Sequence, residues 1–118
     1  MSAPLAEGYL HVEQRVEDVA VVLRAVGEVD VHTAPLFAER LAQAATTTSL
    51  DRVVIDLREV RFFGSKGISA LVVAHQQCRT RGIVLCVVAG PAITRRLDRV
   101  GLLDVLAVCP TLAEALSR

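Results

Sequence analysis

The chain has 118 residues, enough for one compact domain, and 53% of them are hydrophobic, although it contains no Trp, one Tyr and three Phe. Its core must therefore be built from Val, Leu, Ile and Ala. The 13 basic and 13 acidic residues cancel to a formal net charge of zero. No overall electrostatic field then favours nucleic acid or an anionic membrane, and the scarcity of aromatic residues argues against stacking on single-stranded nucleic acid.

The chain shows no sign of secretion or membrane insertion. Its first residues, MSAPLAEG, lack the basic and apolar regions of a secretory signal. The longest apolar stretch, Gly82–Ile93, is too short to span a bilayer and contains Gly90-Pro91. We therefore expect a cytoplasmic protein without a membrane partner, in which residues 1–7 form a flexible N-terminus and residues 8–118 form one domain.

The three cysteines, Cys78, Cys86 and Cys109, form no CxxC motif and no metal-binding spacing with any histidine. An odd number of scattered thiols suits a reducing compartment, where they act as small hydrophobic residues. We expect no metal site, and a regulatory disulfide between Cys78 and Cys109 stays open as an alternative. The sequence also lacks GxxxxGK[ST] and GxGxxG, so no bound cofactor is expected.

Hydrophobic periodicity predicts strands and helices in turn. Two strands come first, a half-exposed one at Leu10–Glu13 and a more central one at Val19–Val26, with a turn at Glu17-Asp18. A helix follows, capped by Thr33 and with Pro35 in its first turn. The expected apolar stripe of this helix consists of Leu36, Phe37, Leu41 and Ala44 or Ala45.

The alternation continues in the second half. A buried strand at Val53–Leu57 leads through a short charged turn to a helix that begins near Ser65 and ends at Arg81-Gly82. The expected inner face of this helix carries Ile68, Leu71, Val72, His75 and Cys78. Further strands are expected at Ile83–Val88 and Val105–Val108, a helix at Pro91–Gly101 with Ile93, Leu97 and Val100 facing inward, and a last helix opened by the capping box Thr111–Glu114.

The resulting order, β-β-α-β-α-β-α-β-α, predicts an α/β fold. Strands that alternate with helices form a mostly parallel sheet, because each helix carries the chain back to the starting edge. The direct turn between the first two strands makes the N-terminal strand antiparallel to the second.

The most informative residue is Ser65, which lies between Gly64 and Gly67 where a strand gives way to a helix. A hydroxyl there can cap the helix, attack an electrophile or carry a phosphate. A nucleophile elbow needs glycine where Phe63 stands. His75, the only later histidine, would lie about 15 Å away at ~1.5 Å per residue. We therefore expect no catalytic residue, and capping and phosphorylation remain open.

An ordered set of motifs carries a resemblance to a known family. The set consists of Gly27-Glu28-Val29-Asp30 with Thr33, Val54-Ile55-Asp56-Leu57 with Val60, Phe62-Phe63-Gly64-Ser65-Lys66-Gly67-Ile68, Arg95-Arg96-Leu97 and Val100-Gly101-Leu102. In this order and at these spacings it resembles the STAS domain, and more narrowly the stand-alone bacterial anti-sigma factor antagonists.

The resemblance implies a regulator that exchanges partners. The unphosphorylated antagonist of this family binds an anti-sigma factor, a serine kinase with a histidine-kinase-like ATPase fold, and so frees a sigma factor. Phosphorylation of a serine at the start of the second helix dissociates the complex, and a serine phosphatase resets it. Carried over by position, that serine is Ser65. The residues expected at the partner surface are Asp30, Thr33, Phe63, Gly64, Ser65, Lys66 and Gly67.

The chain departs from the family at this site, because the usual D-S-S-G run is here Gly64-Ser65-Lys66-Gly67. One candidate hydroxyl remains, and Lys66 adds a positive charge that favours a phosphoserine held by its own loop. Phe62 is expected in the core and Phe63 as a partly exposed partner contact. The alternative function is a STAS scaffold or small-ligand-sensing module that is not phosphorylated at Ser65.

Overall fold

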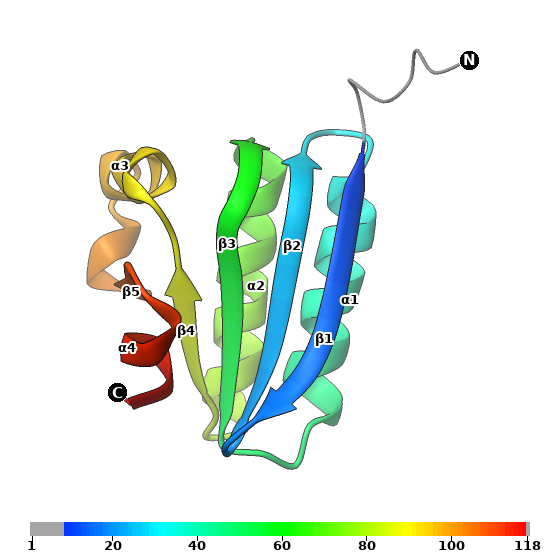
Figure 1. Ribbon diagram of the computed structural model, residues 1–118, viewed down its shortest axis with the longest axis vertical. Coiled ribbons are helices and arrows are strands. Elements are labelled where there is room, and N and C mark those ends of the chain that lie inside the picture. Colours follow the sequence, from blue (N-terminus) through cyan, green and yellow to red (C-terminus); the bar gives the residue numbers. More distant parts are fainter. Residues whose placement is uncertain (1–8, 118) are drawn as a thin grey trace.

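The computed structural model describes residues 9–117, and it confirms the expected α/β architecture (Figure 1). Five strands form one sheet in the order β1-β2-β3-β4-β5, in which β1 is antiparallel to β2 and the remaining neighbours are parallel. The strands are β1 Leu10–Glu17, β2 Ala20–Val29, β3 Arg52–Phe63, β4 Val84–Val88 and β5 Ala107–Cys109. The expected flexible segment, residues 1–7, lies outside the described residues.

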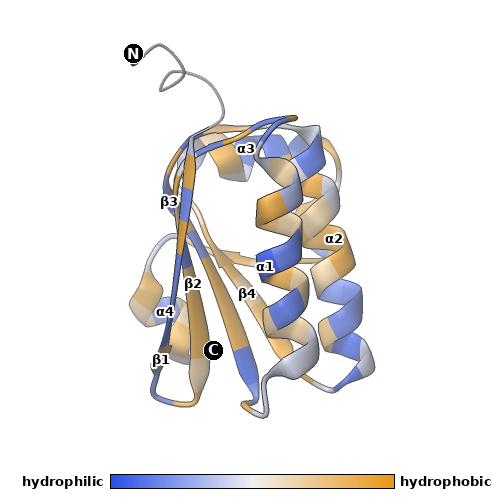
Figure 2. Cartoon of the chain, turned by 90° about the vertical axis from the view of Figure 1, so that its right-hand side faces the viewer, coloured by the Kyte–Doolittle hydropathy of each residue, from blue (hydrophilic) through white to orange (hydrophobic). Residues whose placement is uncertain are grey.

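The helices lie on both faces of the sheet, as Figures 1 and 2 show. They are α1 Ala34–Thr47, α2 Ser65–Thr80, α3 Pro91–Arg99 and α4 Leu112–Ser117, with a 3-10 helix at Leu102–Asp104. The helices α1 and α2 cover one face and bury the larger core cluster, whereas α4 covers a smaller cluster on the other face. Within residues 9–117, none of the helices combines the length and apolar character that a membrane span requires.

The inner faces of α1 and α2 differ in part from the expected stripes. Phe37 and Leu41 of α1 are fully buried, but Leu36 is 39% exposed, so its place in the stripe was wrong. The buried residues of α2 are Gly67, Ala70, Leu71, Ala74 and Cys78, whereas Ile68, Val72 and His75 lie half-buried at the edge of this face. Small residues dominate because α2 packs closely against both the sheet and α1.

The strand β3 is longer than expected, because the charged residues after Leu57 continue the strand instead of forming a turn. Its pairing with β2 shifts twice, between Arg24 and Val26 and between Gly27 and Glu28. Each shift places an extra residue on β3, which is the signature of a β-bulge. Polar side chains on the uncovered face stabilise this extension through ion pairs of Arg24 with Glu59 at 2.7 Å and of Glu28 with Arg61.

The C-terminal elements also shift relative to the sequence-based expectation. Val100 is 56% exposed, because α3 ends at Arg99 and the chain turns away at Gly101 with a positive φ of 77°. Val105 is 49% exposed and precedes β5, which begins at Ala107. The cap of α4 is confirmed, since the Thr111 hydroxyl accepts the N–H of Glu114 at 3.1 Å.

Candidate functional site

Two loops meet at the carboxyl ends of β2 and β3, at the upper end of the sheet in Figure 1. The N–H of Gly64 donates to the carbonyl oxygen of Val29 at 2.9 Å, which ties the end of β3 to the end of β2. Between the loops lies a hollow of about 380 Å³, which we call the Ser65 hollow. Its lining residues are Asp30, Val31, Phe62, Gly64, Ser65 and Lys66.

Ser65 is the first residue of α2, and its side chain is exposed. The capping alternative is wrong, because the N-cap position belongs to Gly64 and no side chain caps this helix. The first helical hydrogen bond is donated by the N–H of Gly67 to the carbonyl oxygen of Gly64 at 3.0 Å. The N–H groups of Ser65 and Lys66 therefore precede the helical ladder, at the positive end of the helix dipole.

The two glycines that flank Ser65 allow close packing, not a left-handed turn. Gly64 has φ −89°, which any residue can adopt, but a Cβ there would lie 3.2 Å from Cε2 of Phe62. A Cβ at Gly67 would lie 2.7 Å from Cε1 of Phe63 and 2.8 Å from Cγ1 of Val29. Gly67 is therefore needed where α2 begins directly against the ends of β2 and β3.

The two phenylalanines at the end of β3 have exchanged the environments expected for them. Phe63 is only 2% exposed and packs edge-to-face on Phe37, with ring centroids 5.7 Å apart. Phe62 is 52% exposed and lines the Ser65 hollow. The expectation of Phe63 as an exposed contact was wrong. Each bulge of β3 moves the following side chains to the other face of the sheet, and the second bulge reverses the effect of the first, so Phe63 faces α1 and α2 like Leu57.

The loop from Asp30 to Thr33 is held in shape by its own side chains. One carboxylate oxygen of Asp30 accepts the N–H of His32 at 2.9 Å and the N–H of Thr33 at 3.0 Å. The buried Thr33 hydroxyl donates to the carbonyl oxygen of Glu28 at 2.7 Å and accepts the N–H of Asp30 at 2.9 Å. Thr33 occupies the N-cap position of α1 as expected, but its hydroxyl shapes the loop and makes no capping hydrogen bond. Val31 at the tip of the loop is 66% exposed.

Sequence reasoning missed Val31 and Phe62, the two exposed apolar residues of the Ser65 hollow. Two signals were available. Phe63 lies an even number of residues after Leu57, which places it inward by simple alternation and leaves Phe62 outward. Val31 stands alone between polar residues in a loop, where an apolar side chain finds no core to enter.

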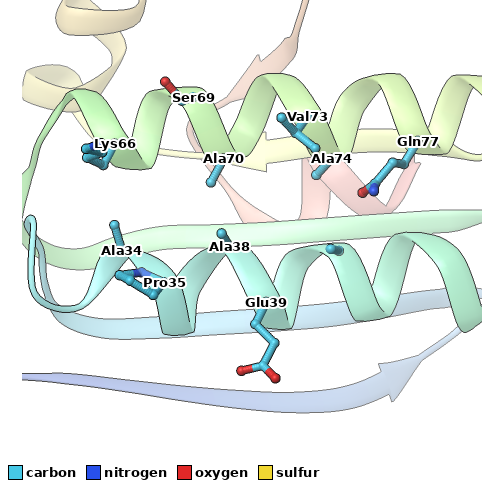
Figure 3. A pocket seen from close by; sticks show the side chains of 11 residues that line it. Ala34, Pro35, Ala38, Glu39, Lys66, Ser69, Ala70, Val73, Ala74 and Gln77 are labelled. Atoms are coloured by element: carbon cyan, nitrogen blue, oxygen red, sulfur yellow. The ribbon is translucent and has the colours of Figure 1, made fainter.

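A second hollow of about 530 Å³ runs between α1 and α2 (Figure 3). Alanines line both of its sides, and Lys66 lies at one end and Gln77 at the other. Lys66 lines both this hollow, which we call the α1–α2 groove, and the Ser65 hollow. The groove was missed from the sequence, because none of its alanines belonged to the expected apolar faces of the two helices.

Asp56, one of the residues that carry the family resemblance, is buried and stabilises the strand β3 instead of facing a partner. Its carboxylate is 4% exposed and makes two hydrogen bonds with the Arg58 guanidinium, at 2.9 and 2.8 Å. Burial raises the pKa of Asp56, but the hydrogen bonds and the charge of Arg58 outweigh burial and hold this pKa below its usual value. Asp56 is therefore ionised and holds the Arg58 guanidinium in place within β3.

His75 is half-buried and the three cysteines are buried. Burial and the charge of Arg79 lower the pKa of the half-buried His75. Cys78 lies in the cluster under α1 and α2, whereas Cys109 lies in the cluster under α4, on the opposite face of the sheet. A disulfide between them is therefore excluded by this fold. Among the described residues, no three His, Cys, Asp or Glu side chains gather as metal ligands.

Comparison with known proteins agrees with this geometry. The family model of the STAS domain matches residues 11–115, so the chain belongs to the STAS domain family. The chain is 33% identical over 102 residues to the anti-sigma-F factor antagonist RsfA of Mycobacterium tuberculosis, covering 85% of this chain and 80% of that protein.

Solved structures show the same similarity. The crystal structure of an anti-sigma factor antagonist from Mycobacterium paratuberculosis is 31% identical, with a TM-score of 0.85, and the match covers 99% of this chain and 97% of that one. A STAS domain protein from Planctomyces limnophilus shares the fold at 24% identity, with a TM-score of 0.72 and coverage of 90% and 94%.

Proposed function

We propose that this chain is an anti-sigma factor antagonist that binds its anti-sigma factor through the Ser65 hollow and is released by phosphorylation of Ser65. The names of the similar Mycobacterium proteins support the antagonist role. The observation that carries the site is the exposed Ser65 hydroxyl at the first position of α2, free of any capping duty. In this proposal the anti-sigma factor is a serine kinase with a histidine-kinase-like ATPase fold.

The chemistry requires little of the chain beyond presenting the hydroxyl. The Ser65 oxygen forms a bond to the γ-phosphorus of ATP, the bond from that phosphorus to the bridging oxygen breaks, and ADP leaves. The hydroxyl proton passes to a base of the kinase. A serine phosphatase later hydrolyses the phosphoester with water and restores the hydroxyl and inorganic phosphate.

The surroundings of Ser65 suit both states. The unphosphorylated hydroxyl is itself uncharged, so a partner can cover it at little cost. The phosphate adds close to two negative charges beside the N–H groups of Ser65 and Lys66 and the Lys66 ammonium group. These groups stabilise the anion within the antagonist, while desolvating it in an interface costs several kcal/mol. Phosphorylation thus opposes binding without opposing folding.

The test is incubation of the chain with each candidate anti-sigma kinase of its own genome and Mg·ATP, followed by mass spectrometry. The proposal predicts a mass gain of about 80 Da on the peptide that contains Ser65, since phosphorylation replaces one hydrogen by PO₃H₂. Ser65→Ala abolishes it. Ser69→Ala, which removes another exposed hydroxyl one turn along α2, leaves it intact. Binding of a kinase without modification of Ser65 favours the scaffold alternative.

A further inference from the structure

The Ser65 hollow has apolar walls and one cation at its edge. Val31, 66% exposed, and Phe62, 52% exposed, come from different loops and line the same hollow. Monomeric proteins expose single apolar side chains routinely, but a valine and an aromatic ring around one hollow form a surface suited to a partner. The exposed Lys66 forms no ion pair within the described part of the chain.

The position of the Phe62 ring depends on Gly64. A Cβ at Gly64 would lie 3.2 Å from Cε2 and 3.6 Å from Cζ of Phe62, so the ring covers the backbone just before Ser65. A larger residue at position 64 would push the ring away from the hollow. The absence of a side chain at Gly64 thus places an aromatic surface next to the Ser65 hydroxyl.

The hollow is lined by one acidic and one basic side chain, and the more exposed of the two is Lys66. The half-buried Asp30 carboxylate keeps its negative charge but accepts the N–H groups of His32 and Thr33, which hold it in its own loop. Lys66 keeps its three donors, and the start of α2 adds the positive end of the helix dipole. A complementary partner therefore presents an acidic group next to an apolar one.

We propose that the Ser65 hollow receives one apolar side chain of the anti-sigma factor between Val31 and Phe62, and that an adjacent carboxylate of that factor pairs with Lys66. This inference rests on the proposed function and names the chemistry by which the partner is recognised. Lys66 then has a second role in regulation. A phosphate on Ser65 competes for Lys66 and repels the partner's carboxylate, so both effects favour release.

The experiment measures the affinity of variants for the kinase-fold anti-sigma factor of the same genome that binds the wild-type chain most tightly. Phe62→Ala is expected to weaken binding at least tenfold and Val31→Ala about threefold, since buried aromatic anchors dominate interfaces. The matched control is Val100→Ala, which truncates another exposed valine, 56% exposed, far along the chain. Its affinity equals that of the wild type, and thermal melting confirms that all variants fold.

The pairing of Lys66 with a carboxylate of the partner is tested by charge reversal and by the salt dependence of binding. Lys66→Glu is expected to weaken binding at least tenfold, because the new carboxylate repels the carboxylate of the partner. The control Arg95→Glu makes the same charge change on an exposed side chain of α3 and leaves affinity within about twofold. Raising the salt concentration weakens binding of the wild type, and Lys66→Gln loses most of this dependence.

The outcomes separate the two proposals. If the wild type binds and Phe62→Ala, Val31→Ala and Lys66→Glu bind like their controls, the inference is overturned and the antagonist role stands. If the apolar variants lose affinity and Lys66→Glu gains it, the partner's charge is basic and the carboxylate claim is wrong. If no kinase-fold anti-sigma factor binds the wild type, the proposed function fails and the inference falls with it.

Discussion

The rim of the Ser65 hollow and the core directly beneath it are formed by residues that are neighbours in the sequence but differ in exposure. Phe62 and Ser65 are exposed at the rim, whereas Phe63 and Gly67 are buried under it. Residues at the rim can be substituted at little cost to the fold. Residues beneath it hold the rim in place, so their substitution reports on stability. This division makes adjacent positions into matched experimental pairs.

The largest expected difference separates the two phenylalanines. Phe63→Ala removes a buried ring that packs on Phe37 and is expected to cost about 3–5 kcal/mol of unfolding free energy. Phe62→Ala removes a half-exposed ring and should cost less than about 1 kcal/mol. Urea denaturation of both variants measures the difference. Equal destabilisation would contradict the assignment of Phe63 to the core and Phe62 to the rim.

The two glycines provide the second comparison. Gly67→Ala places a methyl group within 3 Å of Phe63 and Val29 side-chain atoms, at 2.7 and 2.8 Å, and is expected to cost about 1–3 kcal/mol. Gly64→Ala brings a methyl group to 3.2 Å from the movable Phe62 ring and to an ordinary 3.5 Å from the Val29 carbonyl oxygen, and should change stability by less than about 1 kcal/mol. Melting curves test this, and a Gly67→Ala variant as stable as the wild type would show that α2 can move away from the sheet.

The acid dependence of stability tests the ion pair that the buried Asp56 makes with Arg58 in β3. The folded state lowers the pKa of Asp56 relative to its unfolded value of 3.8, so the unfolded state binds more protons below about pH 4. The stabilisation from the Asp56–Arg58 pair is therefore present above the unfolded pKa and lost as pH falls through the folded pKa. Asp56→Asn lacks this contribution. Denaturation at several pH values should show wild type and variant converging in stability between about pH 4 and 2.

Much of the fold was predictable, because apolar periodicity is strong in a chain built from Val, Leu, Ile and Ala. The strand order, the parallel pairing and the cap at Thr111 follow from local patterns. The environments of Phe62 and Phe63 follow from the even spacing between Leu57 and Phe63, but the two bulges in β3 do not, because they arise from its pairing with β2. The hydrogen bonds of Thr33 to Glu28 and Asp30 also depend on how two segments meet. Local sequence alone cannot specify such contacts.

The smallest effect concerns the thiols. Burial raises the pKa of Cys78 to about 11, and Cys86 and Cys109 are buried as well. A buried thiol with this pKa has almost no thiolate at neutral pH and is inert. Iodoacetamide at pH 8 should therefore label Cys78 in the folded protein much more slowly than in urea. Rapid labelling of native protein would contradict its burial under α1 and α2.

The central claim is that a phosphate on Ser65 changes the charge at the rim of the hollow and leaves the core beneath the rim folded. The most direct measurement compares the anti-sigma factor affinity and the melting temperature of one sample before and after phosphorylation of Ser65. The account predicts a loss of affinity of at least tenfold, which corresponds to about 1.4 kcal/mol, with a melting temperature that is unchanged or slightly higher. Retained affinity, or a loss of affinity that accompanies unfolding, would contradict it.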